Sequence, residues 1–363
     1  MSKIDRLTIQ GFKSIRSLDK LQLNNLNVLI GANGVGKSNF VSYFRMLHEL
    51  VEGRLQVWTS KQGGADRVLT FGLKETSQLS STLRFNDRGG YGIFLAPTVD
   101  ESLTILEEEI YFGEACFEKL GGGSRESLLK ERTSQKPAKH LTEAYHLLSN
   151  IKVFHFHDTS DTAAVKRLGA VHDNEYLRSD AGNLAAYLFK LQRENSEVYA
   201  QICKTVRLAV PFFDDFVLKP IPLASGEEQI RLLWKQADSD YPLWPSQLSD
   251  GSIRFMCLVT ALLQPNPPST IIIDEPELGL HPYAITLLGA LLRSASKRMQ
   301  VIVSTQSVPL LNEFELDDLI VVEREEGAST FKRLDADKFR TWLDDYSVGE
   351  LWEKNIIGGR PSK

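Results

Sequence analysis

The sequence is poor in the features that mark secreted and membrane-spanning proteins. Its 363 residues include only three cysteines, scattered at Cys116, Cys203 and Cys257, and so few indicate neither a disulfide framework nor a zinc site. No apolar run approaches the roughly 18 residues that cross a bilayer, and residues 1–6 lack the apolar core of a signal peptide. We therefore expect a cytoplasmic protein that would reach a membrane only through a partner.

An excess of positive charge is also missing. The formal net charge is -5, so contact with nucleic acid would need a local basic patch. One segment gathers Lys130, Arg132, Lys136 and Lys139, but Glu131 interrupts it. A solvated loop is the simpler interpretation of that segment, and a nucleic-acid contact stays open. Heptads sustained over several turns are absent as well, which excludes a long coiled coil.

The most informative stretch is rich in glycine. Residues 31–38 fit the pattern G-x-x-x-x-G-K-[ST], between an apolar run at 26–30 that predicts a buried strand and apolar residues at helical spacing from Phe40 onward. In such a loop, backbone N–H groups surround phosphates, a lysine reaches the β- and γ-phosphates and a hydroxyl ligates Mg²⁺. The predicted nucleotide-binding residues are Asn33, Gly34, Val35, Gly36, Lys37, Ser38 and Asn39, with Ser38 also a metal ligand.

A second motif ends a continuous apolar run at 270–274. That run is typical of a parallel strand buried on both faces, and it finishes on Asp274 and Glu275. Asp274 is predicted to hold Mg²⁺, directly or through water. Glu275 is predicted to polarise the water that attacks the γ-phosphate. Taken alone, the pattern fits a solvated acidic turn equally well, and the phosphate-binding stretch upstream favours the catalytic interpretation.

A third motif, Leu-Ser-Asp-Gly-Ser at 248–252, precedes a helical apolar pattern. Ser249 or Asp250 is expected to cap that helix, and the free amides of its first turn would suit a phosphate. A plain helix cap is the common alternative. The position of the motif, shortly before the acidic strand, favours the phosphate interpretation.

Together with Ser304-Thr305-Gln306-Ser307, these motifs resemble those of the ABC-type ATPases. Within that group the sequence resembles the soluble branch of SMC heads, RecF and OLD-like phage-defence ATPases, whose opening is similar to residues 7–14. The resemblance implies an α/β P-loop head with a mixed or parallel core sheet, an antiparallel β subdomain and an inserted helical subdomain. The expected boundaries are an N-terminal lobe at 1–112, a largely helical insertion at 113–216 and a C-terminal lobe at 217–363.

The resemblance also implies how the motifs would work. Two copies, or a larger homo-oligomer, would close head to tail on two ATP molecules with Mg²⁺. Ser249, Asp250 and Gly251 of one copy would face the γ-phosphate held by the other, and Glu275 would be the general base. Many relatives carry histidine at the position of Gln306. Because glutamine cannot carry charge, we expect slow, switch-like hydrolysis.

Three further positions stay open. The resemblance implies a glutamine near Mg²⁺ after the first helix, and Gln62 is the nearest candidate. Lys13 could approach the nucleotide or lie in an exposed turn. His155 and His157 could share one strand face, as an ordinary partly buried pair or as metal ligands whose companions cannot be placed.

Three functions fit the sequence. The first is an ATP-dependent sensor or switch in prokaryotic antiphage defence, acting on a separate effector, often a nuclease; we expect another polypeptide to supply it. The second is a RecF-like, ATP-gated DNA repair factor, which a basic stripe would favour. The third is the nucleotide-binding subunit of a transporter, which the large insertion and Gln306 disfavour. The first is the preferred hypothesis, although fold resemblance alone does not settle function.

Overall fold

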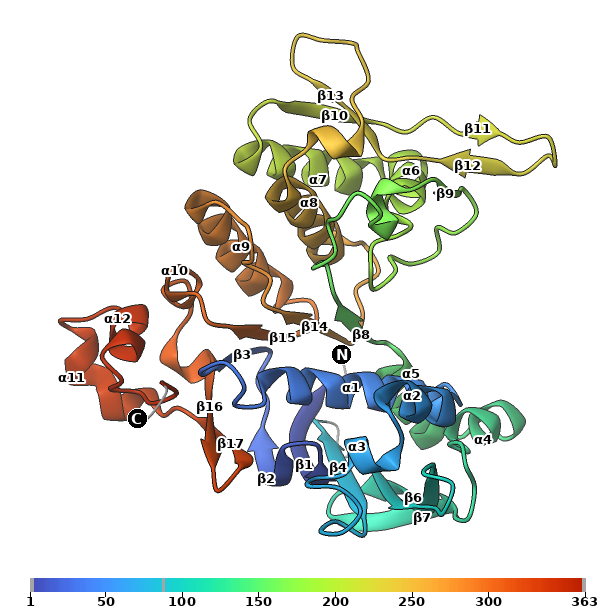
Figure 1. Cartoon of the computed structure of the whole chain (residues 1–363), viewed down its shortest axis with the longest axis vertical. Helices are drawn as coiled ribbons and strands as arrows, with labels where there is room; N and C mark the ends of the chain where they lie inside the picture. The colour runs from blue at the N-terminus through green and yellow to red at the C-terminus, as the bar shows by residue number, and fades with distance from the viewer. Residues whose placement is uncertain (1–2, 87–88, 361–363) are drawn as a thin grey trace. The chain divides into compact units, whose positions relative to one another are not determined.

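The computed structural model describes residues 3–86 and 89–360, and the chain forms two compact units (Figure 1). The first comprises residues 1–153, 268–274 and 299–363, and the second comprises residues 154–267 and 275–298. The short segment 268–274 carries the acidic strand, so this strand belongs to the first unit.

An antiparallel sheet forms one layer of the first unit, with the strand order β2-β1-β4-β5-β6-β7. Its strands are β1 (Ile4–Phe12), β2 (Ile15–Gln22), β4 (Leu79–Phe85), β5 (Gly89–Pro97), β6 (Leu103–Phe112) and β7 (Ala115–Gly121). The sequence predicts an antiparallel meander of three strands near 80–86, 91–97 and 102–112, and these are β4, β5 and β6. Their apolar and polar residues alternate because one face of the sheet is buried.

A mixed sheet forms the other layer, with the order β17-β16-β3-β15-β14-β8. Its strands are β3 (Leu26–Ile30), β8 (Ile151–Phe154), β14 (Thr270–Asp274), β15 (Gln300–Thr305), β16 (Leu319–Glu325) and β17 (Ala328–Arg333). β3, β14, β15 and β16 run parallel. The register pairs Asp274 with Ser304 and Thr305 with Ile30. These strands therefore end at one edge of the sheet, where ligands bind in open α/β folds.

Helix α1 (Lys37–Val51) supplies the core between the two layers (Figure 1). Phe40, Tyr43, Phe44 and Leu47 are fully buried, and they share one hydrophobic cluster with residues of both sheets. A helix that is apolar on most of its circumference is buried on most sides. This packing fixes the first turn of α1, and with it Lys37 and Ser38, against the core.

The remaining helices of the first unit are short. They are α2 (Leu55–Gln62), α3 (Ala65–Val68), α4 (Leu129–Gln135), α5 (Lys139–Ser149), α10 (Val308–Leu311), α11 (Arg340–Leu343) and α12 (Val348–Glu353). The sequence predicts one helix near 336–345. The structure has a 3₁₀ turn, η4 (Ala336–Phe339), followed by α11, and adds α12 beyond it.

The second unit is mainly helical. It contains α6 (Leu184–Glu194), α7 (Ser196–Ala209), α8 (Asp250–Leu263) and α9 (Pro282–Ala295), with the 3₁₀ turns η1 (Ala164–Lys166) and η2 (Pro245–Gln247). Two small antiparallel sheets complete it, formed by β10 (Phe213–Val217) with β13 (Leu233–Gln236), and by β9 (Gly169–Ala170), β11 (Ile221–Pro222) and β12 (Glu228–Ile230). The sequence pattern predicts mostly helix over 178–216, and the structure has α6 and α7 there, followed by β10.

The division of the chain does not follow the boundary expected at residue 113. Residues 115–121 form β7, the edge strand of the antiparallel sheet, and Leu129, Leu141 and Leu148 are buried in the core of the first unit. The division falls between Val153 and Phe154 instead. Likewise, residues 217–267 and 275–298 lie in the second unit rather than with the rest of the expected C-terminal lobe. Within residues 3–86 and 89–360, no helix combines the length and apolarity required to cross a membrane.

Candidate nucleotide-binding site

The glycine-rich stretch forms an open loop between β3 and α1. Gly31, Gly34 and Gly36 have φ angles of 155°, 78° and 115°, in the region that side chains with a Cβ rarely adopt. A Cβ on Gly34 would meet nothing within 4 Å, so this residue faces open space where a phosphate can approach the backbone. The positive φ angles explain why the motif needs glycine here, and the open face fits a phosphate ligand.

The back of the loop is held by segments that the motif does not contain. Ser14, in the turn between β1 and β2, exchanges a hydrogen bond with Ser329 of β17 at 2.6 Å, and the Ser329 hydroxyl donates to the carbonyl of Val35. A Cβ on Gly36 would overlap both hydroxyls. Asn39 Nδ2 donates to Ser14 Oγ at 2.7 Å. No local sequence pattern predicts the contact of Ser14 with Ser329, because the two residues are so distant in the chain.

Lys37 lies at the start of α1 and is 5% exposed. Its Nζ donates to the carbonyls of Gly31 and Ala32 at 2.6 and 2.9 Å. The ammonium is thus held inside the loop that would wrap the phosphates, where it can exchange these carbonyls for phosphate oxygens. A lysine acts on phosphate as a compact point charge, so position matters more than orientation.

Two oxygen-bearing side chains that could hold Mg²⁺ lie on neighbouring elements. Ser38 is exposed in the first turn of α1, and Asp274 ends β14. Ser304 on the adjacent β15 donates its hydroxyl to Asp274 and so orients that carboxylate. A hydroxyl and a carboxylate suit Mg²⁺, which takes few protein ligands together with phosphate oxygens.

Glu275 and Gln306 follow two neighbouring strands. Glu275 directly follows β14 and has a φ of 44°, a left-handed conformation that costs energy in a non-glycine residue and gathers at functional sites. Gln306 follows β15, and its side-chain amide donates to Asn33 of the phosphate loop. Gln306 therefore contacts the phosphate loop, and its role in hydrolysis stays a prediction.

Gln62 lies in a polar cluster with Lys13. Lys13 Nζ donates to Gln62 Oε1 at 2.8 Å and to Ser42 Oγ at 2.7 Å. Ser42 is one turn beyond Ser38 on α1, so the cluster lies on the same face of that helix. Burial, and secondarily the charge of Arg45, lowers the pKa of Lys13. The metal-ligating role of Gln62 stays a prediction, because its amide oxygen is engaged by Lys13.

A cavity of about 710 Å³ adjoins the phosphate loop. Ser14 and Asn39 line it beside the loop, together with Phe71, which is 42% exposed. The Arg16 guanidinium lies 5.0 Å from the centroid of the Phe71 ring. An exposed aromatic ring supported by a cation can accept a planar base. The sequence analysis did not single out Phe71, since a lone phenylalanine after a short helix carries no pattern.

In the second unit, the third motif starts α8 as predicted. Ser249 is the N-cap residue, and its Oγ accepts from the backbone N–H of Ser252 at 3.1 Å. Gly251 packs against the backbone of Gly279, so that a Cβ at Gly251 would overlap the Gly279 carbonyl. The motif and the loop after the acidic strand are thus in close backbone contact.

Arg254 of α8 connects this helix to the loop after the acidic strand and to the segment after β8. The sequence alone did not indicate this role. Arg254 is 8% exposed, and its guanidinium donates to the carbonyls of Phe156 at 2.8 Å, His157 at 3.2 Å and Leu278. Burial lowers the pKa of Arg254, and the charge of Asp250 partly opposes that effect. A charged residue inside the apolar pattern of α8 was the available signal, since arginine is almost never fully buried unless paired.

The histidine pair lies beyond the strand on which it was placed, because β8 ends at Phe154. The rings of His155 and His157 are 5.6 Å apart. Among the described residues, no group of three or more His, Cys, Asp or Glu side chains could hold a metal ion.

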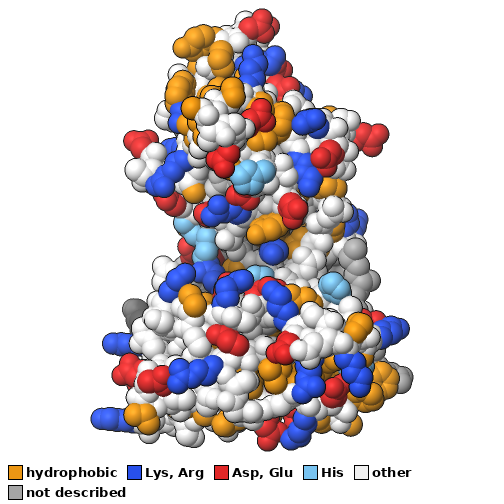
Figure 2. Space-filling model, turned by 90° about the vertical axis from the view of Figure 1, so that its right-hand side faces the viewer, with side chains coloured by type: hydrophobic (Ala, Val, Ile, Leu, Met, Phe, Trp, Pro, Cys, Tyr) orange, Lys and Arg blue, Asp and Glu red, His pale blue; other side chains and the backbone are white. Residues whose placement is uncertain are grey.

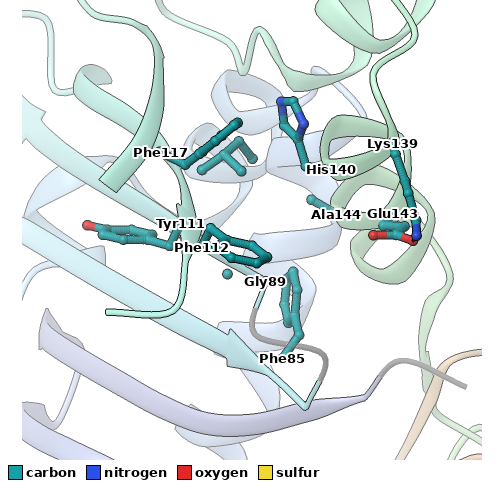
Figure 3. Close-up of a pocket in the computed structure, with 11 residues that line it drawn as sticks. Phe85, Gly89, Tyr111, Phe112, Phe117, Lys139, His140, Glu143 and Ala144 are labelled. Carbon is teal, nitrogen blue, oxygen red and sulfur yellow. The ribbon is translucent and has the colours of Figure 1, made fainter. Parts of the chain in front are cut away.

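The basic segment forms α4 and the start of α5 rather than a loop. Lys130 pairs with Glu52 at 2.7 Å, and Lys139 lies 3.7 Å from Glu143. Lys139 also lines a cavity of about 360 Å³, with His140 from α5 and with Phe112 and Phe117 from the antiparallel sheet (Figure 3). That cavity shares no lining residue with the phosphate loop. On the face drawn in Figure 2, lysine and arginine side chains are interspersed with aspartate and glutamate.

A glycine loop at the carboxyl edge of the parallel strands, with its buried lysine and an acidic strand end, defines a P-loop nucleotide-binding domain. The overall fold is that of SMC heads. An SMC head crystallised with the C-terminal winged-helix domain of ScpA is 15% identical, with a TM-score of 0.64 over 93% of this chain and 99% of that chain. The SMC head with an extended coiled coil, bound to the C-terminal domain of ScpA from Pyrococcus furiosus, is 17% identical, with a TM-score of 0.60 over 95% of this chain and 99% of that chain.

Residues 26–312 match the family described as "AAA domain, putative AbiEii toxin, Type IV TA system", and the chain belongs to that family. Comparison with curated proteins gives no match.

Proposed function

We propose that this protein binds ATP with Mg²⁺, hydrolyses it slowly, and uses nucleotide-driven association of two copies as a switch for a separate effector protein. The observation that carries the proposal is the phosphate loop, with its three positive-φ glycines and its buried Lys37. The toxin and toxin–antitoxin terms in the family description support a role in antiphage defence.

In this proposal, the chain divides the work among a few side chains. Lys37 and the loop amides hold the phosphates, while Ser38 and Asp274 hold Mg²⁺, which would neutralise charge on the β- and γ-phosphates. Glu275 accepts a proton from the attacking water. Gln306 orients that water or the γ-phosphate through its amide, and it cannot supply the charge that histidine would. This difference supports slow turnover.

Association would complete the site. Ser249 and the first-turn amides of α8 from one copy would contact the γ-phosphate held by the other copy. The Ser249 hydroxyl caps the N–H of Ser252, and the N–H groups of Asp250 and Gly251 would face the γ-phosphate, because the first N–H groups of any helix lack an acceptor one turn earlier. ATP would then favour the associated form over ADP, since only ATP carries the γ-phosphate.

The Glu275→Gln variant tests this proposal. It should bind ATP normally and accumulate as an ATP-dependent dimer, while phosphate release falls about 100-fold, because a general base contributes at least that factor. Phosphate release, nucleotide affinity and light scattering measure the three properties. The matched control is Glu131→Gln, at an exposed residue of α4. Phosphate release at the wild-type rate would remove Glu275 as the base.

The same variant can identify the effector. Pull-down of Glu275→Gln from its native host with ATP, followed by mass spectrometry, should retain a stoichiometric second protein. Retention of nucleic acid without a protein partner would instead favour the RecF-like alternative.

A further inference from the structure

Lys166 lies next to the third motif, although it precedes that motif by many residues in the chain. It is the last residue of η1, and its Nζ lies 3.7 Å from Asp250 Oδ1, at the start of α8. A second carboxylate, Asp161 Oδ1, lies 3.9 Å from the same nitrogen. All three residues belong to the second unit.

The lysine stem is packed, whereas its partners are solvated. The side chain of Lys166 is only 8% exposed, while those of Asp250 and Asp161 are 64% and 95% exposed. Pairs of this length with exposed carboxylates contribute little. The ammonium is thus positioned in advance, and the carboxylates that face it can be exchanged for a better anion.

The segment that carries Lys166 is itself fastened to α8. Arg254 binds the carbonyls of Phe156 and His157, and Asp158 accepts hydrogen bonds from the backbone and hydroxyl of Ser160. These hydrogen bonds lower the pKa of Asp158, so that carboxylate is ionised at neutral pH. Val165, beside Lys166, is buried. Lys166 therefore keeps its place relative to the N-terminus of α8.

Asp250, in the third motif, carries a negative charge that disfavours a phosphate at the same helix end, and the positive charge of Lys166 can offset it. A carboxylate at Asp250 would repel a γ-phosphate brought to the same helix end. A phosphate carries more charge and more acceptor oxygens than a carboxylate.

We propose that Lys166 is a further γ-phosphate ligand, which releases Asp250 and binds the nucleotide held by a second copy of the chain. This inference rests on the proposed function, because it assumes association across ATP. Each closed dimer would then contain two such contacts.

A double-mutant cycle in the Glu275→Gln protein tests this inference. The variants are Lys166→Met, which keeps the packed stem without the charge, Asp250→Asn, and the two combined. The dimer dissociation constant with ATP is measured by light scattering, and nucleotide affinity is measured at concentrations where the protein is monomeric. Lys166→Arg is the conservative control.

Lys166→Met should weaken ATP-dependent association at least about tenfold, because a charge-assisted hydrogen bond is lost, and should leave monomer affinity unchanged. The double variant should be as weak as Lys166→Met, and Lys166→Arg should restore association. If the double variant instead associates as well as Asp250→Asn, then Lys166 only neutralises Asp250 and the inference is overturned. Normal association of Lys166→Met overturns the inference alone, whereas failure of the Glu275→Gln parent to associate with ATP overturns the proposed function with it.

Discussion

The phosphate loop and the start of α8 are both proposed to bind phosphate, and they differ in how far they enclose it. The loop surrounds its ligand with the backbone of residues 31–38 and encloses Lys37. The start of α8 is an exposed helix end whose residues Ser249 and Asp250 face solvent. Because enclosure provides many contacts and one helix end provides few, the loop can bind nucleotide in a single copy. The helix end can add selectivity only for a phosphate that is already held.

The largest effect on ATP binding should follow from removing the lysine that the phosphate loop encloses. In Lys37→Ala, the phosphates lose a charge-assisted hydrogen bond of about 1.5–3 kcal/mol. We therefore expect ATP affinity to fall by about 10- to 100-fold, with association lost in consequence. Calorimetry measures the affinity, and Lys61→Ala, at an exposed lysine of α2, is the control. Unchanged affinity in Lys37→Ala would contradict the assignment of the phosphate loop.

A negative charge at the start of α8 should affect ATP-dependent association without changing the affinity of the monomer for ATP. Ser249→Asp and Ser249→Asn both keep a good helix cap, so they differ mainly by one negative charge. We expect Ser249→Asp in the Glu275→Gln protein to lose ATP-dependent association and Ser249→Asn to keep most of it, with equal monomer affinity for ATP. Equal association of the two variants would show that this helix end does not meet the γ-phosphate.

The last prediction concerns folding stability rather than nucleotide binding, and it separates two glycines of the phosphate loop. Gly36→Ala places a Cβ against the hydroxyls of Ser14 and Ser329 at a strained φ, and should lower the free energy of unfolding by about 3 kcal/mol. Gly34→Ala meets open space and should cost about 1 kcal/mol of backbone strain. Urea unfolding measures both free energies, and equal losses of stability would contradict the close contact of Gly36 with Ser14 and Ser329.

The sequence predicts local parts of the site better than distant ones. The phosphate loop, the acidic end of β14 and the Ser249 cap are each encoded in a few adjacent residues, and the structure has the elements they predict. The contact of Ser14 with Ser329 joins opposite ends of the chain. Lys166 and Arg254 act through tertiary contacts, which no spacing rule describes.

One element was hidden by its composition. Strand β7 is exposed along most of its length, as expected of an edge strand, and the glycines at 121–123 that follow it favour a loop. Its apolar alternation is weak because Leu120 is the side chain of this strand that is buried in the core. Edge strands are often charged and irregular, and they are the elements that a periodicity argument misses first.

The support that Ser329 of β17 gives to the phosphate loop has a consequence for synthesis on the ribosome. Val35 and Gly36 are made early, yet the strand that supports them, β17, begins at Ala328, beyond the residues that match the family. A nascent chain that has not yet produced β16 and β17 lacks Ser329 and therefore the support of its loop. This support of the phosphate loop would thus arise only after β17 has been synthesised.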